Sequence, residues 1–127
     1  MNETEIKTHR AYLIEYKQRI ITDLEEIAEY NPHTDDWQAR IDTTEFNEAD
    51  ENEVGDELEA AEERQATLAL LETEYRLTVL ALKKIENGTY GTCEICGKTI
   101  EMARLDADHG ARTCLDHMAD EFDLPIT

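Results

Sequence analysis

The sequence predicts an all-α fold, in which a long antiparallel coiled-coil helical hairpin is followed by a small C-terminal module that ends in a helix. Three observations predict it. Two long stretches carry apolar residues at seven-residue spacing, a polar connection separates them, and all three cysteines lie in the last third of the chain. We place the hairpin in residues 1–88 and the module in residues 89–127.

The first helix is expected over residues 3–30. Asn2 and Glu5 have the spacing of a capping box, and the Asn31-Pro32 pair is a stop signal. The apolar residues form a narrow stripe that is typical of a coiled-coil seam, at positions Ile6, Leu13, Ile20 and Ile27.

The connection at residues 31–57 is the most acidic stretch of the protein. It contains ten acidic residues and one base, Arg40, and shows no sustained period of 3.6 or 2. We expect a loop that includes a short helix around residues 44–50 and forms the acidic tip of the hairpin.

The second helix is expected over residues 56–86, and Asn87-Gly88 supplies a left-handed C-cap. Because the two stripes have similar lengths and the connection is long enough to reverse the chain, each stripe can bury the other. The alternative is a parallel dimer. The second stripe comprises Ala61, Leu68, Tyr75 and Leu82.

The cysteines have the spacing of metal ligands, Cys-x2-Cys-x17-Cys-x2-His. Three thiolates and one imidazole would close a tetrahedral zinc shell, which is a structural site because no position is left for water. His109 is an alternative fourth ligand, whereas His9 and His33 are expected to be solvated. A short helix over residues 115–122 would carry the fourth ligand. The predicted ligands are Cys93, Cys96, Cys114 and His117.

The composition limits the classes of partner. Thirty-one acidic against 12 basic residues give a net charge of -19, which disfavours direct binding to nucleic acid and to anionic membranes. Residues 93–127 alone hold eight acids and three bases, which also argues against a zinc ribbon that reads nucleic acid. An odd number of cysteines, the lack of a long apolar run and an N-terminus unlike a signal peptide indicate a soluble cytoplasmic protein.

Enzyme chemistry has little support in the sequence. It contains no phosphate-binding glycine loop, no nucleophile elbow and no His-Glu-x-x-His zinc motif. The one compact acidic pair beside an aromatic residue, Asp35-Asp36 before Trp37, is more simply an exposed turn. We therefore expect a protein that is not an enzyme.

The cysteine region resembles the DksA/TraR family of bacterial transcription regulators. The resemblance lies in ALKKIENGTYGTCEICG at 81–97, RLDA at 104–107 and ARTC at 111–114. It implies a coiled coil that enters the secondary channel of RNA polymerase, with the zinc module at the channel rim. His117 stands where the family has a fourth cysteine.

The resemblance also implies functional residues. An ungapped alignment places the acidic tip signature of the family on Asp50, Glu53 and Gly55, and we consider Lys98 and Arg104 as candidate contacts at the rim. The family positions that bind the alarmone (p)ppGpp fall on residues that cannot pair with phosphate. These residues are Leu77, Asp108 and Met118.

The leading hypothesis is therefore a monomeric, non-enzymatic regulator that binds RNA polymerase without a (p)ppGpp contact. The alternative is a zinc-stabilised coiled-coil adaptor that no longer binds polymerase, which the changed tip and the missing alarmone residues favour. The sequence does not distinguish activation from inhibition of transcription.

Overall fold

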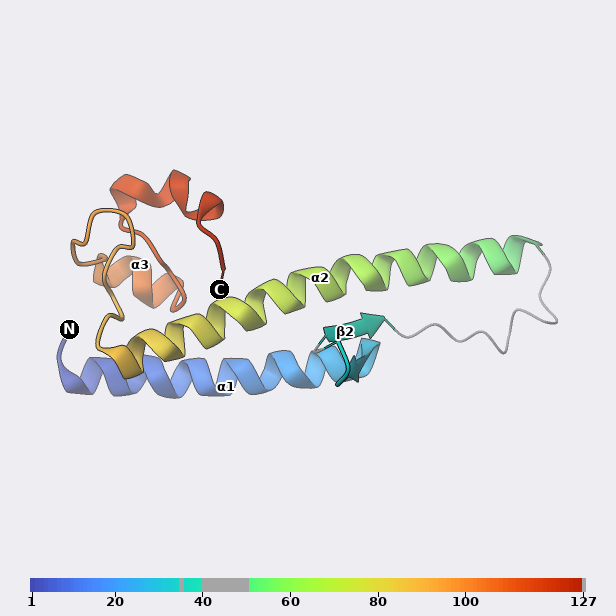
Figure 1. Cartoon of the computed structure of the whole chain (residues 1–127), viewed down its shortest axis with the longest axis horizontal. Coiled ribbons are helices and arrows are strands. Elements are labelled where there is room, and N and C mark those ends of the chain that lie inside the picture. The colour runs from blue at the N-terminus through green and yellow to red at the C-terminus, as the bar shows by residue number, and fades with distance from the viewer. Residues whose placement is uncertain (35, 40–50, 127) are drawn as a thin grey trace. The chain divides into compact units, whose positions relative to one another are not determined.

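The structure is a computed structural model that describes residues 1–34, 36–39 and 51–126, of which the side chains at 39, 51–54 and 57 are not described. Two long helices, α1 (Glu3–Ile27) and α2 (Glu51–Asn87), pack antiparallel (Figure 1). This confirms the predicted intramolecular helix pair. The other elements are β1 (Ala28–Asn31), β2 (Asp36–Ala39), α3 (Met102–Ala107) and the 3-10 helix η2 (Leu115–Asp123).

The chain divides into two compact units. Unit 1 combines Met1–Arg19 with Tyr75–Thr127, and unit 2 is Ile20–Glu74. Each long helix contributes to both units. The predicted boundary between hairpin and module, at residue 88, coincides with the end of α2 and not with the division into these two units. It stays a prediction.

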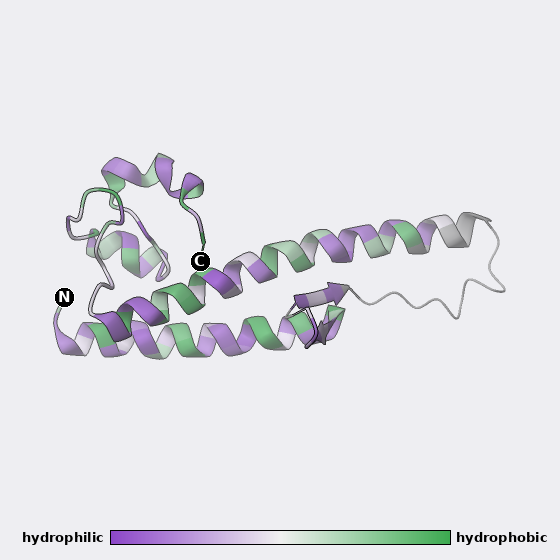
Figure 2. Cartoon of the chain, viewed as in Figure 1, coloured by the Kyte–Doolittle hydropathy of each residue, from purple (hydrophilic) through white to green (hydrophobic). Residues whose placement is uncertain are grey.

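The start of α1 confirms the capping box. The backbone N–H of Glu5 donates to Asn2 Oδ1 (2.8 Å), and the backbone N–H of Asn2 donates to Glu5 Oε2 (3.1 Å). Two backbone donors that the helix leaves unpaired are thereby satisfied. Hydrophobic residues recur along both helices among hydrophilic ones (Figure 2). Leu13 and Ile20 of the predicted α1 stripe are buried, Ile6 and Ile27 are partly buried, and Leu24 beside the stripe is also buried.

The predicted end of the first helix is wrong. The helix stops at Ile27, and residues 28–31 pair with residues 36–39 as a two-stranded antiparallel sheet. Pro32 lies in the turn of this β-hairpin, where it favours the extended conformation of Asn31 before it. Each strand alternates apolar and polar residues (AEYN and DWQA), but four residues is the shortest run that gives such a signal, and the sequence analysis missed it.

The second helix begins earlier than predicted, at Glu51 rather than residue 56. Gly55 therefore lies inside α2, where glycine is weakly unfavourable. The short helix expected at 44–50 falls outside the described residues.

The end of α2 confirms the left-handed cap. Gly88 has φ +77°, the backbone N–H of Thr89 donates to the carbonyl of Lys84 (2.9 Å), and the N–H of Gly88 donates to the carbonyl of Ile85 (3.3 Å). This pair of bonds is the Schellman motif. It ends the helix and turns the chain into the cysteine module.

Unit 1 has a core that the helices and the cysteine module share. Its buried residues come from α1, α2 and the module: Leu13, Ala81, Tyr90, Cys93, Ile100, Leu105, Ala111 and Cys114. Leu82 and Ile85 pack against it. Helix α3, which the sequence analysis did not predict, contributes Leu105.

Among the described residues of unit 2, the buried hydrophobic ones are Ile20, Leu24, Ala28, Ala61 and Leu68. The terminal helix is a 3-10 helix over Leu115–Asp123, close to the predicted 115–122. Among the described residues, no helix combines the length and the apolar character needed to cross a membrane.

Two glycines allow a matched test of the helix boundaries. A Cβ at Gly55 or at Gly88 would meet no atom within 4 Å, so only the backbone conformation distinguishes them. We expect Gly55→Ala to raise the free energy of unfolding by about 0.5–1 kcal/mol, because alanine loses less conformational entropy in a helix. Gly88→Ala should lower it by about 1 kcal/mol, because the left-handed conformation is strained for alanine. Thermal and urea unfolding followed by circular dichroism measures both. Equal effects would contradict the assigned helix bounds.

Candidate metal centre

A tight turn presents the first two cysteines. The backbone N–H of Cys93 donates to the carbonyl of Lys98 (2.8 Å), and the N–H of Gly97 donates back to the carbonyl of Cys93 (3.0 Å). Gly97 has φ +74°, which a glycine adopts without strain. Thr92 and Thr99 form an antiparallel bridge beneath the turn. The turn thus holds Cys93 and Cys96 on one side.

The start of η2 presents the other two residues of the motif. Cys114 is the N-cap of this helix, and the backbone N–H of His117 donates to the carbonyl of Cys114 (3.1 Å). One helical turn therefore brings the thiol and the imidazole together. The backbone N–H of Glu94 also donates to the carbonyl of Arg112 (2.9 Å), which joins the two pairs.

The four predicted ligand atoms form one cluster, in which all lie within 4.8 Å of one another. Cys96 Sγ is 3.7 Å from Cys114 Sγ, and His117 Nδ1 is 3.3 Å from Cys114 Sγ and 3.8 Å from Cys93 Sγ. A tetrahedral ion with metal–sulfur bonds of about 2.3 Å and a metal–nitrogen bond of about 2.0 Å would separate sulfurs by about 3.8 Å and sulfur from nitrogen by about 3.5 Å. The observed distances fit such a shell, so the cluster can hold a metal ion.

The polar groups around the cluster favour a thiolate at Cys93. Burial alone would raise the pKa of this thiol, but the backbone N–H groups of Cys96, Cys114 and Ile95 outweigh it and lower the pKa to about 6. Burial and the neighbouring thiols raise the pKa of Cys114. Several thiolates in one site repel each other unless a cation neutralises them, and this requirement is consistent with metal binding.

The alternative ligand His109 lies elsewhere in unit 1. Its ring stacks on Tyr12 at 3.7 Å between centroids and contacts His9 at 4.8 Å. The expectation that His9 is solvated is wrong, because this residue is 4% exposed. It lies one helical turn before the buried Leu13, on the face of α1 that carries the stripe.

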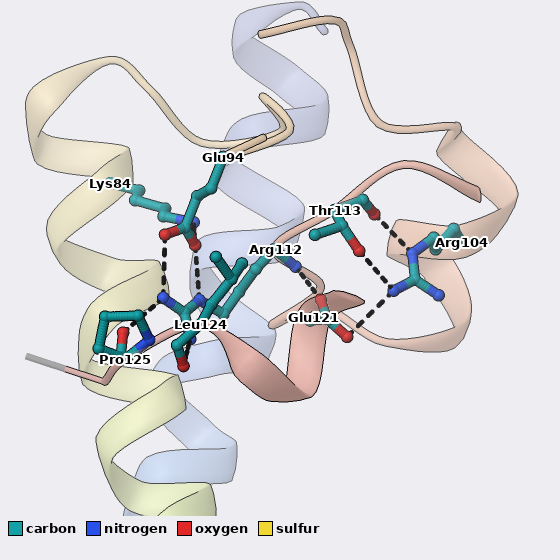
Figure 3. A network of polar contacts seen from close by, with 8 residues as sticks. All are labelled: Lys84, Glu94, Arg104, Arg112, Thr113, Glu121, Leu124 and Pro125. Atoms are coloured by element: carbon teal, nitrogen blue, oxygen red, sulfur yellow. Dashed lines mark hydrogen bonds and ion pairs between the residues drawn. The ribbon is translucent and has the colours of Figure 1, made fainter. Parts of the chain in front are cut away.

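An ion-pair network that the sequence analysis missed includes residues next to Cys93 and Cys114 in the chain (Figure 3). Arg112 is buried, and its guanidinium donates to both carboxylate oxygens of Glu94 (2.5 and 2.9 Å) and to the carbonyls of Leu124 and Pro125 (3.2 and 2.8 Å). Lys84 on α2 donates to the same carboxylate (2.7 Å). Glu94, which lies between the two cysteines of the turn, is thereby linked to α2 through Lys84 and to the C-terminal segment through Arg112. Arginine spacing in a single sequence gives no signal for such a network.

The two rim candidates differ in their surroundings. Arg104 donates to the carbonyl and the hydroxyl of Thr113 (2.6 and 3.3 Å) and to Glu121 Oε2 (3.0 Å), and its side chain is 12% exposed. The backbone N–H of Arg112 donates to the other oxygen of Glu121. Arg104 therefore anchors η2 (Figure 3), whereas Lys98 is exposed.

The tip candidates are not brought into one described site. Asp50 lies outside the described residues, and Glu53 and Gly55 lie in the first turns of α2.

Comparison with known proteins places this module in a family. Residues 88–116 match the sequence pattern of the prokaryotic dksA/traR C4-type zinc finger. The module is a DksA/TraR-family zinc finger. The match ends at residue 116, so it includes the three cysteines but not His117.

Two curated proteins of Bacillus subtilis (strain 168) are similar to this chain in part. "Uncharacterized protein YteA" is 38% identical over 82 residues, 60% of this chain and 34% of that protein. "Uncharacterized protein YlyA" is 41% identical over 58 residues, 45% of this chain and 47% of that protein. The chain therefore spans between a third and a half of the length of these relatives.

Solved structures show that the DksA-like fold extends over nearly the whole chain. The transcription factor DksA2 from Pseudomonas aeruginosa aligns with a TM-score of 0.71 at 19% identity, and covers 97% of this chain and 87% of its own. The RNA polymerase binding protein and transcriptional regulator Dks from Chlamydia trachomatis aligns with a TM-score of 0.54 at 20% identity, over 97% and 92%. The predicted helical hairpin with a C-terminal zinc module is thus confirmed as a fold.

Glu94→Gln tests the network. The charge of Arg112 would remain buried without its carboxylate, and we expect the free energy of unfolding at neutral pH to fall by about 1–3 kcal/mol. Glu86→Gln, at an exposed position of α2, is the matched control and should change little.

The same variant has a defined pH dependence. Burial by itself would raise the pKa of Glu94. Hydrogen bonds from Arg112 and Lys84 outweigh it and hold this pKa below its ordinary value of 4.5. Its stabilisation is therefore present above pH 4.5 and is lost as the pH falls through the lowered folded-state pKa. The stability difference between wild type and Glu94→Gln should vanish in that acidic range. A difference that persisted there would show that the charge of Glu94 is not its cause.

Proposed function

We propose that this protein is a non-enzymatic, cytoplasmic regulator of transcription that binds bacterial RNA polymerase as a monomer. In this proposal the connection between α1 and α2 enters the secondary channel of the polymerase and reaches the active site, and the zinc-finger module rests at the channel rim. The DksA-like fold supports the proposal, since it covers 97% of the chain.

The distribution of charge is the observation that carries the proposal. Unit 2 contains 19 acidic and 2 basic residues, a net charge of -17, whereas unit 1 contains 12 acidic and 10 basic residues, a net charge of -2. Nearly the whole net charge of the protein thus belongs to the part that includes the predicted tip. A negative surface of this kind suits a channel that contains cations, and it repels nucleic acid.

The proposed tip residues are Asp50 and Glu53, with Gly55 at the position where the family has alanine. Carboxylate oxygens are preferred ligands of Mg²⁺ and partners of basic side chains, so these residues could act at the catalytic centre. At the rim we propose Lys98 as a contact. Arg104 would have to leave Thr113 and Glu121 to serve as a second one.

We also propose that the metal ion is zinc, held by Cys93, Cys96, Cys114 and His117. The donor set is soft and tetrahedral, which suits zinc, and a closed shell of four protein ligands is structural. A contact with (p)ppGpp is not part of the proposal. Of the three positions expected to bind it, Leu77 and Met118 carry no charge and Asp108 would repel phosphate.

The second candidate function is a zinc-stabilised adaptor that has lost polymerase binding. Glycine at position 55 and glutamate at position 53 depart from the tip pattern of the family, and this observation favours the adaptor. The experiments below separate the two.

Purified core RNA polymerase tests the leading proposal. We expect the protein to co-purify with core polymerase and to be displaced by another factor that occupies the secondary channel. A failure to bind, or binding that such a factor does not affect, would exclude the proposal and favour the adaptor.

Charge reversal tests the tip. The double variant Asp50→Lys/Glu53→Lys should keep its binding to polymerase while losing its effect on transcription in vitro, because the rim contacts remain. Glu86→Lys, an exposed charge reversal near the base of α2, is the control and should keep both. If the tip variant regulated promoters like the wild type, the assigned tip would be wrong.

Metal analysis tests the site. We expect one zinc ion per chain, and His117→Ala should weaken zinc binding at least about tenfold, because one of four ligands is lost. His109→Ala should leave the zinc content unchanged. Loss of zinc in the His109 variant alone would move the fourth ligand to that residue.

A further inference from the structure

The β-hairpin between the long helices carries an exposed aromatic pair. Tyr30 on β1 lies opposite Trp37 on β2 in the register of the sheet, and their rings lie 5.5 Å apart with an interplanar angle of 56°. Directly opposed residues of an antiparallel ribbon project from the same face. Tyr30 is 47% exposed and Trp37 is half-buried, so the pair offers accessible aromatic surface rather than forming part of a closed core.

Carboxylates lie close to this pair. The backbone N–H of Trp37 donates to Asp36 Oδ1 (2.9 Å) and to Glu72 Oε1 of α2 (3.3 Å). Glu29 precedes Tyr30 in β1. Both strands and Glu72 belong to unit 2, whose net charge is -17. The aromatic rings thus lie within a negative region, with two carboxylates fixed at the backbone of Trp37.

We propose that the Tyr30–Trp37 pair, with Asp36 and Glu72, is a docking site for an arginine side chain of a partner protein. This inference goes beyond the proposed tip and rim contacts, because neither includes the β-hairpin. It does not depend on the identity of the partner.

The chemistry of the site selects its occupant. A guanidinium stacks on aromatic faces and donates hydrogen bonds to carboxylates at the same time, so it matches both parts of the site. The surrounding charge rejects phosphate and therefore nucleic acid. A second copy of this unit would bring the same negative charge, which also disfavours self-association through this face.

The single tryptophan of the chain makes the site directly observable. Titration of the full-length protein with hexa-arginine, with selective excitation of tryptophan, should give a saturable change in fluorescence. Hexalysine carries the same charge but no planar group, and it should bind more weakly. Hexaglutamate should give no change.

Matched variants distinguish binding at this site from nonspecific electrostatic attraction to the negative unit. Tyr30→Leu keeps an apolar side chain but removes the ring, and should weaken hexa-arginine binding by about two- to fivefold. Tyr30→Phe keeps the ring and should bind like the wild type. Glu72→Gln should weaken binding, whereas Glu59→Gln, at an exposed position of the same helix, should have a smaller effect. Circular dichroism of each variant checks that it is folded.

Three results would overturn the inference. These are the lack of a saturable change, equal affinity for hexa-arginine and hexalysine, and equal effects of the Glu72 and Glu59 variants. Since the titration contains no polymerase, its outcome is separate from that of the polymerase-binding experiment.

Discussion

The tetrahedral cluster of three thiols and one imidazole is the constraint on which unit 1 depends. The four candidate ligands come from a turn at residues 93–96 and from the start of η2, and they meet only when the chain between them has folded. Cys93 and Cys114 are also members of the hydrophobic core that contains Leu13 of α1 and Ala81 of α2. A bound metal ion and core packing would therefore stabilise the same arrangement, since the ion would neutralise thiolates that the core would otherwise bury as charges.

Unit 1 is nearly neutral because ten bases offset most of its 12 acids. Three of these bases form ion pairs inside the unit: Arg112 and Lys84 bind Glu94, and Arg104 binds Glu121. Unit 2 has only two bases for its 19 acids. The protein thus combines a nearly neutral unit 1 with a strongly negative unit 2, and the proposed function assigns a separate contact to each.

The sequence predicted features whose signal is local and missed those that depend on distant partners. Ligand spacing predicted that Cys93, Cys96, Cys114 and His117 lie together, and heptad spacing predicted both helices, because each pattern is visible within short segments of the chain. Two features join segments that are far apart in the chain, so no local pattern predicts them. These are the burial of His9 beside His109 and the ion pair of Arg112 with Glu94. The β-hairpin was missed although both strands alternate apolar and polar residues, because four residues is the shortest run that carries this signal and the first strand directly continues the stripe of α1.

The central claim is that the connection between α1 and α2 reaches the catalytic centre of RNA polymerase. Its most direct test replaces the catalytic Mg²⁺ of core polymerase with Fe²⁺, which generates hydroxyl radicals that cut only nearby polypeptide. In the complex with this protein, the account predicts cleavage of the chain within residues 40–60 and no cleavage in the zinc-finger module. Cleavage confined to the module, or an uncut chain in a complex shown to be intact, would contradict the account.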